Sequence, residues 1–196
     1  KTIKDLIKSG QEITVQVIKD PFDNKGPRVT KNITFPGRYI VLMPNSDYIG
    51  VSRRIEDEDE RNRLKEIVSE IKPKGMGIII RTEAENKGIE EIKEDLNYLL
   101  KIYNKIKREE MIGYAPKLLY QDLDLIHRTI RDVFNKDVEE VIINDREAYD
   151  SVRSFAEIIS PGLKDRIKYF DPGLNVFDYF GIEKMIHEAL SRKVWL

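Results

Sequence analysis

The sequence predicts a mixed α/β (α+β) fold built from short strands and amphipathic helices. Two runs of mainly aliphatic and β-branched residues, Tyr39–Met43 and Gly77–Ile80, are typical of short buried strands. Apolar residues repeat with helical spacing from Ile89 to Ile106, which predicts a long amphipathic helix. Beyond residue 127, strand and helix patterns alternate, as in proteins where helices cover a sheet.

Composition sets broad limits on the function. The chain has 196 residues, enough for one large domain or two to three small ones. Its net charge of −1 argues against a general nucleic-acid coat protein. The charge is uneven, however, because residues 1–54 contain ten Lys or Arg and five Asp or Glu. A polyanion is therefore expected to bind at the N-terminal quarter, although ordinary fluctuation produces an excess of this size too.

The cellular context follows from what the sequence lacks. Cysteine is absent, which excludes disulfides and thiolate metal sites and fits a cytoplasmic location. The sequence has no run of about 18 apolar residues, so we expect no membrane span, and no charged-then-apolar signal segment opens it. The chain begins at Lys1 rather than Met, and we expect it to be a fragment of a longer protein.

The N-terminal segment, residues 1–35, is predicted to form β structure. Apolar and polar residues alternate from Ile13 to Val17, and turn-forming residues fill Asp20–Gly26. A second strand is predicted from Val29 to Phe35. Two strands cannot form an independent core.

A cation and a hydroxyl follow the strand that ends at Ile80. Arg81 offers a planar fork of N–H donors, and Thr82 offers an O–H besides its backbone N–H. This combination suits a terminal phosphate, while the plain alternative is a surface salt bridge and a cap. On the other predicted strand, Gly37 lets a ligand approach the backbone, and Pro44 ends the ladder.

Between these strands, residues 51–55 (Val-Ser-Arg-Arg-Ile) are predicted to run extended. Adjacent residues of a strand face opposite ways, so one of Arg53 and Arg54 can face the site while the other faces solvent. The acidic run Asp57–Glu60 is predicted to be the solvated first turn of a helix, where the helix dipole favours negative charge, rather than a metal site.

Three carboxylates near the predicted strand 138–143 invite a nuclease interpretation, namely Asp145, Glu147 and Asp150. Two-metal chemistry needs carboxylates that converge from several strands. These three lie in one strand-to-helix segment, where caps and turns use Asp anyway. The two histidines, His127 and His187, have no partner at metal-ligand spacing and are interpreted as structural or surface residues. No metal ligand and no catalytic residue is predicted.

Several motifs, in this order and at these spacings, resemble the ribonuclease E/G family of endoribonucleases. They are Lys25–Thr30, Pro36–Pro44, Gly50–Ile55 and Gly77–Thr82. The resemblance extends from about Gly10 to Leu196. It implies that residues 1–31 are the last part of an OB-fold RNA-binding barrel, residues 32–126 a 5′-sensor subdomain, and residues 127–196 a structural ribonuclease-H-like subdomain.

The resemblance implies a site for the 5′-monophosphate of single-stranded RNA. Arg81 would grip the phosphate oxygens, Thr82 would donate its hydroxyl and its N–H, and the backbone at Gly37 and Val41 would line the same pocket. A triphosphate would be too large for such a cage. Four basic residues complete the prediction: Arg53 and Arg54 as supporting residues, and Lys19 and Lys25 as either RNA-strand contacts or solvated loop lysines.

The resemblance also implies chemistry that this chain lacks. The family's catalytic carboxylates lie in a nuclease domain beyond these residues, and its paired cysteines bind the zinc that joins protomers. We therefore expect a homo-oligomeric parent that uses Mg and Zn in RNA processing and decay. The fragment itself is expected to bind RNA ends without a cofactor and without cutting.

Two other functions compete with this hypothesis. The first is a non-catalytic RNA-binding or scaffold module without end preference, which only a comparison of RNA ends can separate. The second is a free-standing small α/β hydrolase. The absence of cysteine, of metal-spaced histidines and of a nucleophile elbow argues against it.

Overall fold

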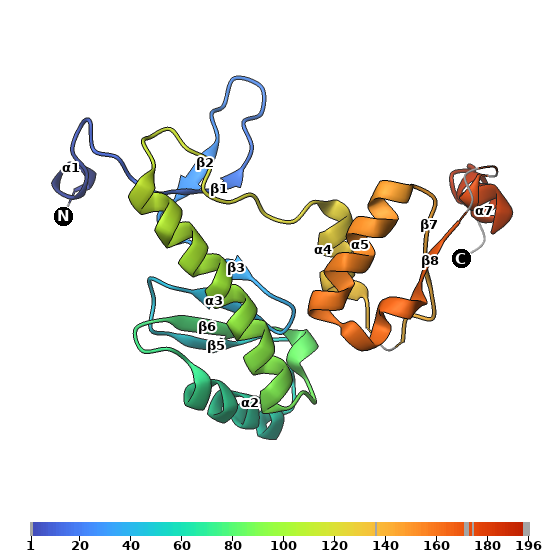
Figure 1. Cartoon of the computed structure of the whole chain (residues 1–196), viewed down its shortest axis with the longest axis horizontal. Coiled ribbons are helices and arrows are strands. Elements are labelled where there is room, and N and C mark those ends of the chain that lie inside the picture. Colours follow the sequence, from blue (N-terminus) through green and yellow to red (C-terminus); the bar gives the residue numbers. More distant parts are fainter. Residues whose placement is uncertain (1, 136, 171–172, 174, 194–196) are drawn as a thin grey trace. The chain divides into compact units, whose positions relative to one another are not determined.

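The computed structural model describes residues 2–135, 137–170, 173 and 175–193, and it contains two compact units (Figure 1). The first unit spans Lys1–Asp122 and the second spans Leu123–Leu196. Helices and short strands in several small sheets confirm the predicted mixed α/β class. The assignment of three subdomains within the chain stays a prediction.

A four-stranded sheet forms the centre of the first unit, with the order β3-β4-β6-β5. Its strands are Phe35–Pro36 (β3), Ile40–Met43 (β4), Ile49–Val51 (β5) and Gly77–Ile80 (β6). Strand β6 pairs antiparallel with β4 and parallel with β5. The two aliphatic runs predicted as strands are thus the middle strands of the sheet, where both edges of each strand are paired.

Two helices pack on one face of this sheet, α2 (Glu58–Ile71) and α3 (Ile89–Ile112) (Figure 1). Apolar residues at helical spacing supply the buried face of each helix. The fully buried side chains of this core come from alternate strand positions and from both helices, including Ile40, Leu42, Ile78, Ile80, Leu64, Val68 and Ile92. Helix α3 ends at Ile112, and Gly113 is its C-cap residue.

The acidic run Asp57–Glu60 forms the N-cap and first turn of α2, as predicted. The Asp57 carboxylate accepts hydrogen bonds from the backbone N–H of Asp59 at 2.9 Å and of Glu60 at 3.3 Å. This N-cap satisfies donors that the first turn leaves unpaired. Among the residues that the structure describes, no three His, Cys, Asp or Glu side chains are grouped so that they could hold a metal ion.

The chain before the sheet forms a short helix, α1 (Ile3–Leu6), and a hairpin of β1 (Gln16–Lys19) and β2 (Arg28–Thr30). The predicted strand from Val29 to Phe35 is wrong as one element. The Thr30 hydroxyl accepts from the Asn32 N–H at 3.1 Å, and the chain turns there. Phe35 therefore belongs to the four-stranded sheet, while Val29 stays in the hairpin.

The predicted extended run at residues 51–55 is also wrong. Strand β5 ends at Val51, and the Ile55 N–H reaches back to the Ser52 carbonyl at 3.4 Å. This turn carries Ile55 into the core, where its side chain is 1% exposed. Arg53 and Arg54 lie in the turn, and both side chains are exposed, so strand alternation does not separate them.

The second unit alternates strand and helix, as predicted. Its elements are α4 (Leu125–Val133), β7 (Val141–Ile143), α5 (Arg146–Ile159), η2 (Pro161–Arg166), β8 (Ile167–Tyr169), α6 (Val176–Tyr179) and α7 (Ile182–Ala189). Strands β7 and β8 are parallel. A separate core holds this unit together, with Ile130, Phe134, Val152, Phe155, Ala156 and Ile167 buried. In the described parts of both units, no helix is long and apolar enough to cross a bilayer.

We expect Leu64→Ala to lower the free energy of unfolding of the first unit by about 2–5 kcal/mol, because the Leu64 side chain is fully buried. Leu118→Ala is the matched control, since Leu118 is 75% exposed, and should stay within about 0.5 kcal/mol of the parent. Urea unfolding of both variants measures this difference. Equal losses would show that the core is misassigned.

Candidate phosphate-binding site

Three chain segments meet at one edge of the four-stranded sheet. Because β4 runs antiparallel to β6, its start lies beside the end of β6, and because β5 runs parallel, its end lies there too. Two backbone hydrogen bonds extend the ladder past the strands. The Arg81 N–H donates to the Tyr39 carbonyl at 2.8 Å, and the Ser52 N–H donates to the Ile80 carbonyl at 2.8 Å.

The structure brings Arg81 and Gly37 together, two of the predicted site residues. The Arg81 Nη1 donates to the Gly37 carbonyl at 2.5 Å, and its Nε lies 3.4 Å from the Glu83 carboxylate. The Arg81 side chain is 22% exposed. The Gly37 N–H donates to the Ile40 carbonyl at 2.8 Å. Gly37 therefore contributes to this site through its carbonyl, which orients the Arg81 guanidinium.

Asp95 on α3 organises the same turn, although it was not among the predicted site residues. Its carboxylate accepts backbone N–H groups from Arg38 at 3.0 Å, Tyr39 at 2.8 Å and Ile40 at 3.1 Å. Burial raises the pKa of Asp95, and the three N–H donors and Arg81 pull that pKa in the opposite direction. The sequence feature that could have indicated this role is an Asp within the apolar stripe of the helix.

Asp95 also explains why position 37 is a glycine. A Cβ atom at Gly37 would lie 2.5 Å from Asp95 Oδ2 and 2.6 Å from Oδ1. No side chain fits at that distance. The glycine is therefore required for the close approach of a carboxylate of the same chain, in addition to any approach of a ligand.

Thr82 begins the 3₁₀ helix η1 (Thr82–Ala84), directly after Arg81. Its hydroxyl lies 3.0 Å from the hydroxyl of Ser52, which follows β5. The Arg54 N–H donates to the Ser52 hydroxyl oxygen at 3.3 Å. Ser52 was part of a recognised motif, but nothing in the sequence showed that it would meet Thr82.

We call Gly37, Ser52, Arg81 and Thr82 the strand-end set, and the other predicted residues lie outside it. Val41 pairs with Ile79 inside the sheet, and its half-buried side chain lies on the face opposite Ile40. Arg53 and Arg54 are exposed in the turn after Ser52. Two more predicted residues lie on the exposed hairpin, Lys19 at the end of β1 and Lys25 in its loop.

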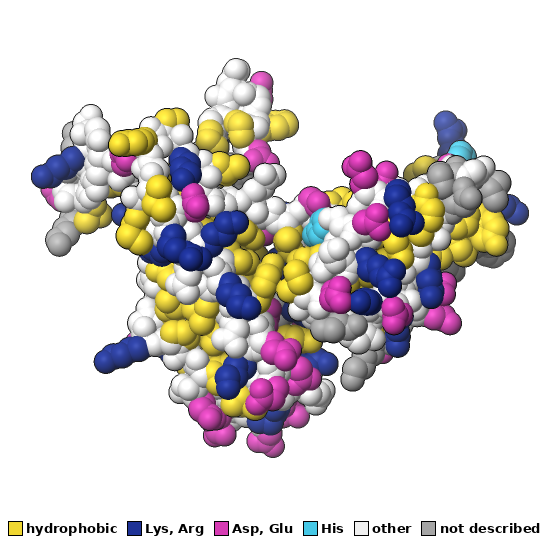
Figure 2. Space-filling view, in the orientation of Figure 1, with side chains coloured by type: hydrophobic (Ala, Val, Ile, Leu, Met, Phe, Trp, Pro, Cys, Tyr) yellow, Lys and Arg dark blue, Asp and Glu magenta, His cyan; other side chains and the backbone are white. Residues whose placement is uncertain are grey.

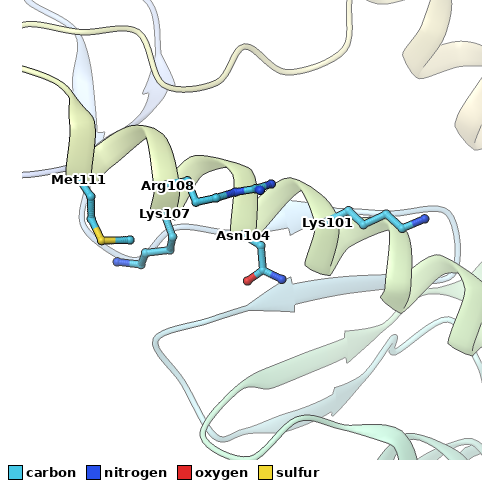
Figure 3. A pocket seen from close by; sticks show the side chains of 5 residues that line it. All are labelled: Lys101, Asn104, Lys107, Arg108 and Met111. Atoms are coloured by element: carbon cyan, nitrogen blue, oxygen red, sulfur yellow. The ribbon is translucent and has the colours of Figure 1, made fainter.

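A shallow open depression of about 520 Å³ lies elsewhere, on α3 (Figure 3). Its lining side chains all project from this one helix: Lys101, Asn104, Lys107, Arg108 and Met111. Figure 2 shows Lys and Arg side chains over this helix and Asp and Glu side chains toward α2. No residue of the strand-end set lines the depression, so it is the space between neighbouring side chains on a charged helix face.

Two of the three carboxylates that invited a nuclease interpretation, Asp145 and Asp150, serve as a cap and as an ion-pair partner. The Asp145 carboxylate accepts the Ala148 N–H at 2.7 Å and caps α5. Asp150 lies 3.3 Å from Arg146 on the same helix. These contacts agree with the interpretation of Asp145 and Asp150 as local structure.

His127 lies between Asp124 and Ser151 in an order that resembles a hydrolase triad. Its Nδ1 is 2.8 Å from the Asp124 carboxylate, and its Nε2 is 3.0 Å from the Ser151 hydroxyl. Asp124 also caps α4 through the His127 N–H at 2.8 Å. Ser151 lies inside α5, where the helix uses the backbone N–H groups that an oxyanion hole would need. The contact therefore joins α4 to α5, and it gives no support to a free-standing hydrolase.

Comparison with known proteins identifies the family of the chain. The profile of the ribonuclease E/G family matches residues 34–196, and the chain belongs to this family. It is 36% identical over 196 residues to Ribonuclease G of Escherichia coli. It is 40% identical over 195 residues to Ribonuclease E of a Nostoc species. These alignments cover 100% and 98% of this chain but 40% and 28% of the relatives, so the chain spans two fifths or less of their length.

We expect Gly37→Ala to destabilise the first unit by about 1–3 kcal/mol, because its Cβ would overlap the Asp95 carboxylate. Gly26→Ala is the matched control, since no atom lies within 4 Å of a Cβ built there. In an Asp95→Ala background the Gly37→Ala cost should shrink, because the obstructing atoms are gone. Urea unfolding of the parent chain and of the four variants measures these costs, and an undiminished cost would contradict the assigned contact.

Proposed function

We propose that this chain is the RNA-binding, 5′-monophosphate-sensing part of an endoribonuclease of the ribonuclease E/G type. Its substrate would be single-stranded RNA in RNA processing and decay. The observation that carries the proposal is the convergence of Arg81 and Thr82 with the Gly37 turn at one edge of the sheet. Family membership supports the same proposal.

The chemistry of the strand-end set suits a terminal phosphate. Near neutral pH a monophosphate carries a charge of about −1.5 to −2 and has strong acceptor oxygens. Arg81 is mostly buried with its guanidinium oriented by the Gly37 carbonyl, so little ordering is needed when an anion binds. The Thr82 hydroxyl follows in the next residue and adds a neutral donor. A 5′-hydroxyl offers no charged partner to this set.

The lysines of the β1–β2 hairpin support a second contribution to RNA affinity, from contacts along the RNA strand. Lys19 and Lys25 are exposed on β1 and in its loop, where a strand of RNA can reach them. Contacts to internal phosphates give affinity that does not depend on the RNA end. If these contacts dominate, the chain is an RNA-binding module without end preference.

We further propose a cytoplasmic, homo-oligomeric parent that uses Mg²⁺ for cleavage and Zn²⁺ between protomers. Neither ion is assigned to the described residues, in which no suitable group of ligands occurs. The contribution of this chain is then to bind and align the RNA. Cleavage belongs to parts of the parent beyond these residues.

We expect a short single-stranded RNA with a 5′-monophosphate to bind about tenfold to a hundredfold more tightly than the same RNA with a 5′-hydroxyl. Arg81→Gln should remove most of this ratio, because it removes the charged partner. Thr82→Val should remove part of it, because the backbone N–H survives. Fluorescence anisotropy at one fixed low salt concentration measures both RNAs, since phosphate contacts are screened as salt rises.

Two controls separate end recognition from strand binding. Arg153→Gln removes one positive charge from the second unit and should leave the ratio unchanged. Lys25→Ala should weaken both RNAs alike. Equal binding of the two RNAs by the parent chain, or a ratio untouched by Arg81→Gln, would remove the sensor assignment and favour the general RNA-binding module.

We expect residues 1–196 alone to cleave no RNA in Mg²⁺ or Mn²⁺, because their carboxylates at Asp145 and Asp150 serve local structure. Gel analysis of an end-labelled RNA measures this. Metal-dependent cleavage that Asp145→Asn abolishes, and that the matched Asp165→Asn leaves intact, would contradict the prediction.

A further inference from the structure

The hydroxyls of Ser52 and Thr82 meet because of the strand register. Strands β5 and β6 are parallel, and Val51 is level with Ile80. The Ser52 N–H then adds one more ladder bond, to the Ile80 carbonyl at 2.8 Å. The residues that follow each strand are thereby held together, and the two hydroxyl oxygens lie 3.0 Å apart. Both side chains are partly buried.

Hydrogen-bond stoichiometry gives this contact a direction when an anion is present. A hydroxyl has a single proton to donate and can also accept. The Ser52 oxygen already accepts from the Arg54 N–H at 3.3 Å. If Ser52 donates its proton to Thr82, the Thr82 proton is left for a third group. An anion beside Arg81 favours the arrangement in which Ser52 donates to Thr82 and Thr82 donates to the anion. Each of these hydrogen bonds then polarises the next one.

The position of Ser52 is fixed independently of any ligand. Its carbonyl accepts from Arg61 Nη1 at 2.8 Å, and the same nitrogen donates to the Ile55 carbonyl at 3.0 Å. Arg61 belongs to α2, which packs in the core of the unit. The serine therefore does not have to be ordered when a ligand arrives, and such preorganisation favours binding.

We infer that Ser52 is a positioning residue of the 5′-phosphate site, whose hydroxyl directs the Thr82 hydroxyl proton toward the terminal phosphate. The inference rests on the proposed function. It adds a residue that touches no phosphate itself and that sets part of the preference for a 5′-monophosphate over a 5′-hydroxyl.

The test compares the same two RNAs with serine variants. Ser52→Ala should lower the ratio of 5′-hydroxyl to 5′-monophosphate dissociation constants about twofold to tenfold, the range for one neutral hydrogen bond. The dissociation constant of the 5′-hydroxyl RNA should stay unchanged. Ser52→Thr keeps a hydroxyl and should restore the ratio, which a merely structural defect would not allow.

Ser46→Ala is a closely matched control. The Ser46 hydroxyl also accepts a backbone N–H two residues ahead, from Tyr48 at 3.3 Å, but it lies at the opposite end of β5. Ser52→Ala also loses the bond to Thr82, so it should lose at least as much thermal stability as Ser46→Ala. Only Ser52→Ala should change the ratio, and a change of equal size in Ser46→Ala would overturn the inference.

A double-mutant cycle isolates the hydroxyl pair. In the Thr82→Val background there is no hydroxyl to direct, so Ser52→Ala should have no further effect on the ratio. An unchanged ratio in Ser52→Ala, or the same loss with and without Thr82, would overturn the inference while the Arg81→Gln result still supports the sensor. A parent chain that binds both RNAs equally would overturn the proposed function and this inference together.

Discussion

The pairing of β6 along both of its edges is the constraint on which the first unit depends. One neighbour is antiparallel and the other is parallel, so the start of β4 and the ends of β5 and β6 lie where the sheet ends at Ile80. The connection from β5 to β6 runs through α2, which closes the core over the same face as α3. Side chains alternate along a strand, so a slip of one residue would move Ile78 and Ile80 out of the core. The register that buries the core also fixes where Arg81 and Ser52 lie.

The buried carboxylate of Asp95 determines how an anion can be held at this edge. Consecutive backbone N–H groups in a turn can form an anion-binding nest. Here the N–H groups of residues 38–40 serve Asp95 instead. Under the proposed function, an incoming phosphate therefore has to rely on the Arg81 side chain and on the hydroxyl and N–H of Thr82. The turn contributes indirectly, because its Gly37 carbonyl orients the Arg81 guanidinium.

Local patterns in the sequence predicted the elements well and the contacts between them poorly. The aliphatic runs at β4 and β6 and the apolar stripe of α3 follow from side-chain periodicity, and Arg81 and Thr82 could be placed at a strand end from adjacency alone. Asp95 contacts a turn that lies more than fifty residues earlier, and Ser52 meets Thr82 across thirty. Such pairs depend on register, which no local pattern specifies.

The errors have a similar origin. The run at residues 51–55 looked extended, but the turn after Ser52 is set by the need to bury Ile55 and by the Arg61 guanidinium, which lies on another element. The split between β2 and β3 depends on the Thr30 hydroxyl, which competes with the ladder for a backbone N–H. Side chains that bond to the backbone end strands where hydrophobic patterns would continue them.

Charge balance at the sheet edge gives the proposed site a physical limit. Burial raises the pKa of Asp95, and the nearby Arg81 guanidinium opposes that rise, so Arg81 already interacts with a carboxylate of its own chain. Glu83 lies 3.4 Å from the same guanidinium. A monophosphate would bring a charge that one guanidinium and neutral hydroxyls can satisfy. Further phosphates would bring more negative charge toward Asp95 and Glu83 without a new cation among these contacts. Under the proposed function, electrostatic repulsion by these carboxylates therefore acts with limited space to favour a single phosphate.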